Sequence, residues 1–311
     1  MANKLFFIVG LPKTGSTWLS NMLNDVPGFV CRGEGRFFSS GLDGAPSLYQ
    51  AVLRSVTDWS AYVSERRGNW LESRGEIWTV ARRNYVSSRG KERLCQEVTD
   101  SIVASIARNL MSEHFAEGVV AVGDKTPAFS TNEIDTMCRN FPDAKIILLH
   151  RGIHDFICSY AMHFYRSTKD ARPDSKLLDF DIDDFLQIHF HLQGQNSAFL
   201  SEERVISLVK KWSDFEQKIH SLADSENILQ VVYEDLRSDT VSWLGRIVKF
   251  VAGESSSDEL AVIVDNWAFD GAKMKQDVRT AHVNSKKIGY GEEVLGRELC
   301  ALIESELKVL P

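Results

Sequence analysis

The stretch LFFIVGLPKTGSTWL, residues 5–19, restricts the fold of this chain more than any other feature. A short, continuous apolar run followed by turn residues predicts a strand that is buried on both faces. The loop after it holds Gly10 and Gly15, and we predict that a helix begins near Gly15. A buried strand that passes through a tight loop into a helix is the repeating unit of parallel α/β sheets.

Three later apolar runs have the same character, and helical patterns separate them: Val119–Val122, Lys145–Leu149 and Ile228–Val232. The segment Lys91–Phe115 places apolar residues four apart, from Leu94 to Leu110, which predicts a helix packed on the core through that stripe. We therefore predict an α/β fold with a parallel β-sheet flanked by helices, a three-layer sandwich like that of phosphate-loop NTPases with helical insertions. Residues 1–311 are predicted to form one domain, with an insertion at about 37–115 and a mobile loop at about 269–291.

The size and charge of the chain restrict its partners. With 311 residues it can bury a large core, so stability requires neither disulfides nor metals. A net charge of −7 argues against general binding of nucleic acid, so an anion site must be a local basic cluster. Five scattered cysteines without a CxxC pair predict reduced thiols. Lacking a signal segment or a membrane-length apolar run, the sequence is expected to be cytoplasmic, with no membrane partner.

The glycine loop has almost the pattern of a phosphate loop. Gly10 and Gly15 have the required spacing, but Ser16 and Thr17 fill the last two places and the lysine, Lys13, lies inside the loop. Loop N–H groups and the positive end of the next helix would bind an anion, whereas the alternative is an ordinary strand-to-helix turn. In a triphosphate site the lysine contacts the terminal phosphates. Lys13 would instead approach a phosphate leaving group from the side.

The segment PKTGSTW at 12–18 resembles the 5′-phosphosulfate loop of sulfotransferases, which use 3′-phosphoadenosine 5′-phosphosulfate (PAPS). In HRGIHDFICSY, Arg151 and Ser159 have the spacing of that family's 3′-phosphate motif. Arginine offers phosphate a planar fork of donors, and serine adds a hydroxyl. A surface arginine and a helical serine are the alternative reading. The resemblance implies PAPS as co-substrate, adenosine 3′,5′-bisphosphate (PAP) as product, and the following donor-binding residues: Lys13, Thr14, Gly15, Ser16, Thr17, Trp18, Arg151 and Ser159.

Two further segments are similar to the same family. The segment VVYEDL matches its strand-ending Tyr-Glu-Asp-Leu, which implies that Tyr233 lies near the adenine, although a buried core tyrosine fits as well. The segment SKKIGYG takes the place of its Arg-Lys-Gly loop, which implies that Lys286 and Lys287 cover the 3′-phosphate. The family's arginine is absent there, and a solvated lysine pair is the alternative.

Sulfuryl transfer requires a base for the acceptor proton and charge stabilisation for the sulfuryl group and the leaving phosphate. The segment DKTP at 124–127 resembles that of carbohydrate and tyrosylprotein sulfotransferases, whose glutamate base follows the first helix. The matching segment here is CRGEGRFF at 31–38. The resemblance implies that Glu34 is the general base, that Lys125 stabilises the transferring group and that Lys13 assists the leaving phosphate. Alternatively, Glu34 pairs with Arg32 or Arg36 on the surface.

Weaker patterns indicate further candidate residues. His154 and His163 are the fallback bases, and Arg36, Phe38 and His163 are the candidate acceptor contacts. No metal is expected, because the cationic side chains neutralise the charge and the His189-x-His191 pair has no partner motif. The expected acceptor is a small molecule with a hydroxyl or amine, bound by the 37–90 insertion and the segment around 163–195. Natural-product biosynthesis in a bacterium is the favoured setting.

Two other functions compete with this interpretation. A phosphate-loop kinase or NTPase with a degenerate loop would use Asp124 at a strand end to bind magnesium. A catalytically inactive nucleotide-binding protein is the third possibility, although Lys13, Glu34, Lys125 and Arg151 are all present. Dependence on magnesium and ATP would separate the kinase from the sulfotransferase.

Overall fold

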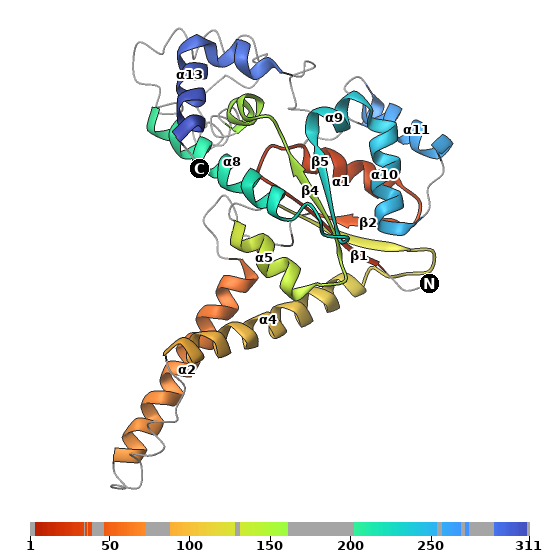
Figure 1. Ribbon diagram of the computed structural model, residues 1–311. Helices are drawn as coiled ribbons and strands as arrows, with labels where there is room; N and C mark the ends of the chain where they lie inside the picture. Colours follow the sequence, from red (N-terminus) through yellow and green to blue (C-terminus); the bar gives the residue numbers. More distant parts are fainter. Residues whose placement is uncertain are drawn as a thin grey trace, which may run out of the picture.

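The computed structural model has a five-stranded parallel sheet in the order β2-β3-β1-β4-β5 (Figure 1). It describes residues 4–33, 35, 37–38, 47–72, 88–127, 131–160, 202–253, 257–268, 271–273 and 289–309. The strands are β1 (Lys4–Gly10), β2 (Phe29–Arg32), β3 (Ala121–Pro127), β4 (Lys145–His150) and β5 (Ile228–Val232). The predicted α/β fold with a parallel sheet is confirmed.

The sheet is buried on both faces, which explains why β1 is a continuous apolar run. Phe7 and Val9 of β1 belong to one apolar cluster, whereas Phe6 and Ile8 belong to the other. Helices α4 (Ser88–Ser112), α5 (Thr131–Asn140), α8 (Glu202–Ser221) and α13 (Tyr290–Val309) contribute to the first cluster. Helices α1 (Ser16–Asp25), α9 (Tyr233–Ser238), α10 (Thr240–Ala252) and α11 (Ser257–Trp267) contribute to the second. The result is three layers.

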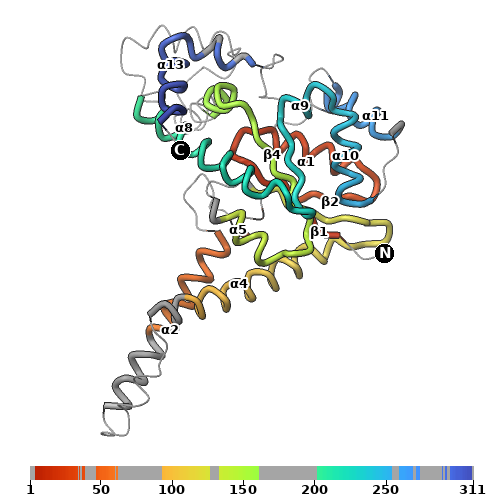
Figure 2. The backbone as a smooth tube through the Cα atoms, viewed as in Figure 1, coloured from red at the N-terminus to blue at the C-terminus, as the bar shows by residue number. Residues whose placement is uncertain are grey.

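The tube view shows that segments distant in sequence pack together on the second face (Figure 2). Helix α11 lies against α1, and the indole Nε1 of Trp18 donates to the carbonyl of Trp267 at 2.9 Å. Among the helices that the structure describes, none is both long and apolar enough to cross a bilayer.

Strand β2 is not predicted from the sequence pattern, because four residues ending in an arginine show neither a continuous apolar run nor a regular alternation. It lies at an edge of the sheet. The Asn24 amide donates to the Cys31 carbonyl and accepts from the Cys31 N–H, both at 2.7 Å. The side chain of Asn24 thus supplies the hydrogen bonds that a neighbouring strand would supply, and it protects the edge from other chains.

The predicted core stripe of α4 is wrong. Leu94, Val98, Ile102 and Leu110 are between 38% and 55% exposed. The neighbouring stripe, with the same spacing, is buried instead: Cys95, Thr99, Val103, Ala107 and Met111. Its small residues allow closer packing than the larger stripe does, and the period alone cannot separate two adjacent stripes.

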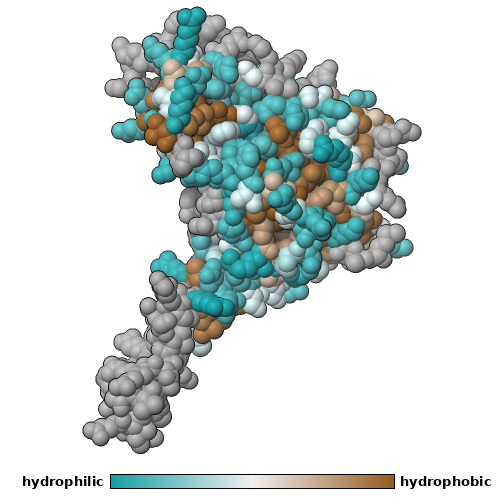
Figure 3. All heavy atoms as spheres, in the orientation of Figure 1, coloured by the Kyte–Doolittle hydropathy of each residue, from teal (hydrophilic) through white to brown (hydrophobic). Residues whose placement is uncertain are grey.

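Helix α2 (Leu48–Glu72) packs against the first part of α4, and the later part of α2 projects from the body as an arm (Figure 1). Hydrophobic side chains gather where the arm joins the body (Figure 3). A groove of about 500 Å³ lies between the two helices and has no charged residue in its lining: Ala51, Val52, Ser55, Val56, Trp59, Leu94, Cys95, Val98 and Ile102. Helices α2 and α4 both lie within residues 37–115, the predicted insertion.

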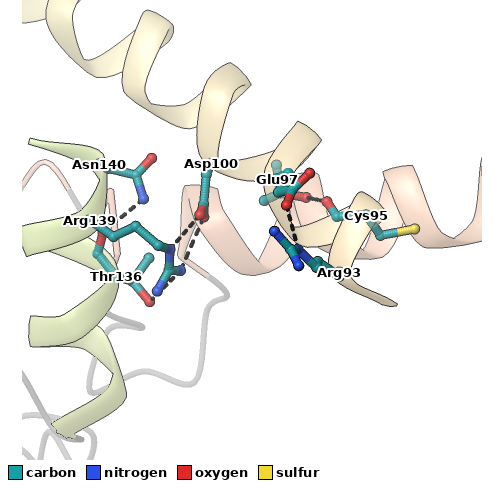
Figure 4. A network of polar contacts seen from close by, with 8 residues as sticks. Arg93, Cys95, Glu97, Asp100, Thr136, Arg139 and Asn140 are labelled. Carbon is teal, nitrogen blue, oxygen red and sulfur yellow. Dashed lines mark hydrogen bonds and ion pairs between the residues drawn. The ribbon is translucent and has the colours of Figure 1, made fainter. Parts of the chain in front are cut away.

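A polar network holds α4 to α5 at the base of the arm (Figure 4). The Arg139 guanidinium donates to both oxygens of Asp100, at 2.5 and 3.2 Å. Burial raises the pKa of Asp100, but hydrogen bonds from Arg139, Asn140 and Tyr49 outweigh it, so that its pKa lies below its usual value. The ionised form of Asp100 therefore stabilises the fold.

Replacing Asp100 by asparagine is expected to lower the free energy of unfolding at pH 7 by less than about 1 kcal/mol, because Arg139 is partly exposed. The folded-state pKa is depressed, so this contribution is fully present above the unfolded-state pKa and is lost as the pH falls through the folded-state pKa. Urea titrations of both proteins between pH 7 and pH 2 should converge at the acid end. Glu97→Gln, which affects an exposed pair with Arg93, is the matched control and should have no measurable effect. A difference for Asp100→Asn that persists at full strength in acid would contradict the assignment.

Candidate active site

The loop between β1 and α1 is tightly folded at the carboxyl end of the sheet. Lys13 has a φ of 74° and Gly15 a φ of 89°, so two residues of the loop adopt the left-handed region. The buried Thr14 hydroxyl donates to the Leu11 carbonyl at 2.8 Å and fixes the turn. Gly15 is the N-cap of α1, and no side chain caps the helix there. The N–H groups of a first helical turn are a place where an anion can bind, which agrees with the predicted anion site.

The Arg151 side chain brings the second motif to this loop. Its Nη1 donates to the carbonyl of Lys13 at 3.0 Å, and its guanidinium carbon lies 4.5 Å from the centroid of the Tyr233 ring. A Cβ on Gly15 would lie 2.5 Å from that ring, so only glycine fits at this position. The Trp18 ring meets Tyr233 edge-on at 6.2 Å. Five of the predicted donor-binding residues are therefore brought together.

Arg151 is buried and surrounded by opposite charge. Its Nη2 lies 3.7 Å from Asp155, and its Nε lies 3.9 Å from Glu234, which also accepts from the Gly152 N–H at 3.1 Å. Residues 153–160 are helical, and Ser159, partly buried, lies two turns after Arg151. These contacts fix the plane of the guanidinium, which is what bidentate recognition of a phosphate requires.

The end of β3 presents three buried polar residues. Asp124, Lys125 and Thr126 are all at most 6% exposed. Lys125 is in register with Ile8 of β1 and points to the face covered by α1, because side chains alternate along a strand. Burial raises the pKa of the Cys31 thiol, the charge of Asp124 adds to this, and the Lys125 ammonium partly opposes it. That thiol therefore stays protonated and is unsuited to nucleophilic chemistry.

Asp124 ties the segment after β2 to β3. It accepts the Gly35 N–H at 2.9 Å and also accepts a hydrogen bond from the Thr126 hydroxyl. A Cβ on Gly35 would lie 2.8 Å from the Asp124 carboxylate and 2.6 Å from the Phe37 ring, so this close approach requires glycine. The residue before Gly35, Glu34, lies outside the described residues, as do Arg36, His163, Lys286 and Lys287.

The remaining predicted residues lie as follows. Thr14 and Ser16 are buried, and Thr17 is partly buried in the first turn of α1. Phe38 is 3% exposed and packs against Tyr49 and Phe141, so its ring has little surface to offer an acceptor. The Nδ1 of His154 lies 3.5 Å from the Glu292 carboxylate. Within the described part of the chain, no group of three or more histidine, cysteine or acidic residues could hold a metal.

Sequence reasoning could not identify the carboxylate partners of this site. Glu234 contacts the Arg151 segment from 82 residues away, and Asp155 contacts glycines about 135 positions later. Asp155 lies inside the quoted 3′-phosphate motif, which is the one available signal. Its hydrogen-bond partners depend on tertiary contacts that no local pattern encodes.

The site combines a phosphate-loop-like strand, loop and helix with a second motif, and an arginine joins the two at the carboxyl end of a parallel sheet. This arrangement defines a class of anion-binding α/β enzymes. The sequence model of the Sulfotransferase family matches residues 6–255. The chain therefore belongs to the sulfotransferase family and is a sulfotransferase.

The chain is similar to several solved structures. The mouse sulfotransferase SULT7A1, complexed with PAP, is 14% identical with a TM-score of 0.51, over 98% of this chain and 83% of that chain. The sulfotransferase domain from the curacin biosynthetic pathway is 15% identical with a TM-score of 0.49, over 98% of both chains. That from the Synechococcus PCC 7002 olefin synthase is 18% identical with a TM-score of 0.46, over 99% of this chain and 96% of that chain. A search of curated proteins gives no match.

Proposed function

We propose that this protein transfers the sulfuryl group of PAPS to a hydroxyl or amine of a small-molecule acceptor, with Glu34 as the general base. The observation that carries the proposal is the hydrogen bond from Arg151 to the Lys13 carbonyl, at 3.0 Å. It joins the two segments that resemble the phosphate-binding motifs, although they are 138 positions apart. Lys13 and Arg151 provide cationic groups on a chain with a net charge of −7, and these groups suit an anionic donor.

The proposed donor contacts follow from this arrangement. The loop and the first turn of α1 receive the 5′-phosphosulfate through N–H groups and through Lys13. Arg151 and Ser159 receive the 3′-phosphate. Tyr233, Lys286 and Lys287 are proposed as further contacts on the resemblance described above. These cationic side chains neutralise the donor, so the proposal involves no metal.

The proposed transfer is an in-line displacement at sulfur. The acceptor oxygen gives its proton to the Glu34 carboxylate as it forms a bond to sulfur, and the bond from sulfur to the phosphate oxygen breaks. Lys13 stabilises the charge that develops on the leaving phosphate, and Lys125 stabilises the sulfuryl oxygens. The products are the sulfated acceptor, PAP and a protonated Glu34, which returns its proton to solvent.

The kinase alternative receives less support from the site. A kinase would use an acidic strand end to bind magnesium. Asp124 is 1% exposed, and its two oxygens accept hydrogen bonds from Gly35 and Thr126. A carboxylate held inward in this way serves the protein scaffold better than a metal ion.

Calorimetric titration tests the proposal. In the absence of magnesium, PAP is expected to bind at least about tenfold more tightly than AMP, since the 3′-phosphate adds charge-assisted hydrogen bonds. Arg151→Ala should remove most of that preference. Arg246→Ala is the matched control, because Arg246 stacks on Trp243 in α10 and should leave binding unchanged. A preference for ATP that develops only with magnesium would mean that the chain is a kinase or NTPase.

A further inference from the structure

Asp155 joins two parts of the chain that are distant in sequence. It lies one helical turn after Arg151 and is 3% exposed. Its Oδ2 accepts the Gly289 N–H at 3.0 Å, and its Oδ1 accepts the Gly291 N–H at 2.6 Å. The same carboxylate lies 3.7 Å from Nη2 of Arg151. Both carboxylate oxygens thus have partners, as a buried charge requires.

The backbone at Gly291 fits closely against the helix that contains Asp155. A Cβ on Gly291 would lie 2.3 Å from the carbonyl carbon of His154 and 2.4 Å from the N atom of Asp155. The Cys158 thiol, one turn further on, contacts the Gly291 carbonyl at 3.6 Å. Steric fit and hydrogen bonds therefore place Gly291 on the first turns of this helix, next to Arg151.

The orientation of Arg151 depends on partners on several sides. The Lys13 carbonyl and the Tyr233 ring contact the guanidinium, and Asp155 lies beside its Nη2. A guanidinium that loses one of these partners gains rotational freedom. Recognition of a phosphate by two parallel N–H groups requires a fixed plane, so such freedom weakens binding.

We propose that Asp155 is a positioning residue of the 3′-phosphate site, an inference that rests on the proposed function. It fixes the plane of Arg151 and holds the backbone of Gly289 and Gly291 against the same helix. The sign of the effect separates this role from a purely electrostatic one. A carboxylate repels a phosphate, so loss of its charge alone would strengthen binding of PAP. Loss of positioning weakens it.

The test is a calorimetric comparison of PAP and AMP on the full-length chain. In Asp155→Asn the preference for PAP over AMP is expected to fall by about tenfold, the effect of one lost charge-assisted hydrogen bond. An Asp155→Asn protein with wild-type or stronger PAP preference would overturn the proposal.

Asp25→Asn is the matched control. Asp25, the last residue of α1, accepts from Nε1 of Trp267 at 2.5 Å and from Nζ of Lys273 at 2.7 Å. Asp25 therefore holds the chain just before residues 274–288, and Asp155 holds it just after them. Asp25 lies at the C-terminal end of α1, which is remote from the phosphate loop. The Asp25→Asn variant is expected to prefer PAP over AMP as strongly as the wild type does. An equal loss in both variants would show a general effect of tethering and would overturn the specific role of Asp155.

Gly291→Ala provides a second route to the same contact, because the new methyl group displaces the Gly291 backbone while the carboxylate remains. It should also reduce the PAP preference, and the double variant should show no further loss, since both changes remove one interaction. Full additivity would contradict the proposal.

Amide exchange in the wild type tests the positioning role of Asp155 without any variant. The Gly289 and Gly291 N–H groups should exchange more slowly with PAP bound than with AMP bound, and equal exchange would overturn the role.

The outcomes separate the two proposals. A wild-type protein that binds PAP no better than AMP would disprove the proposed function itself. A wild type that prefers PAP, together with an Asp155→Asn variant that prefers it equally, would disprove the positioning role alone.

Discussion

Replacing Glu34 by glutamine is expected to lower kcat by about 10²- to 10⁴-fold, the usual contribution of a general base. Glutamine has nearly the same shape but cannot accept the acceptor proton. PAP affinity should stay close to that of the wild type, since the proposed donor contacts come from other residues. Initial rates with PAPS, followed by an assay of the sulfated product, measure kcat. Calorimetry measures the affinity for PAP.

The pH dependence gives this prediction a second readout. A base works only when it is ionised, so the wild-type rate should fall on the acid side and that limb should be absent from Glu34→Gln. Glu259→Gln, an exposed change on α11, is the control and should behave as the wild type does. Wild-type turnover in Glu34→Gln would show that the base is another group, and His154 and His163 would then be the next candidates.

Replacing Lys125 by methionine is expected to lower kcat by about 10²- to 10³-fold, the range seen when one stabilising donor of a transition state is removed. Methionine keeps most of the length of the lysine side chain but removes its charge. Lys125 is 6% exposed and points to the face of the sheet that α1 covers, and α1 is the helix that follows the phosphate loop. A charge in such a site acts strongly, because little water screens it.

Lys145→Met is the matched control for this change. Lys145 is also a strand lysine, but it begins β4 at the opposite end of the sheet and donates to Asn227 at 2.7 Å. Its loss should lower stability without changing kcat. Thermal unfolding of both variants separates folding from catalysis. A Lys125→Met enzyme that is folded and retains the wild-type kcat would exclude Lys125 from the chemistry.

The parts of the site that could be predicted lie within single short segments. The apolar run of β1, the spacing of Gly10 and Gly15, and the helix after them are adjacent in sequence, so local pattern specifies them. The stripe on α4 shows where such patterns fail. Two adjacent stripes have the same period, and packing selected the one with small residues, which no periodicity can indicate.

The sequence by itself determined the succession of elements along the chain, because local side-chain character specifies each one. These elements are a buried strand, a glycine loop, and helices that alternate with further strands. Only the tertiary structure decided which distant groups meet. The Arg151 side chain reaches the Lys13 carbonyl, Tyr233 lies against Gly15, and Asp155 holds Gly291. These contacts arise because parallel strands align their carboxyl ends at one edge of the sheet, which brings together loops that are far apart in the chain.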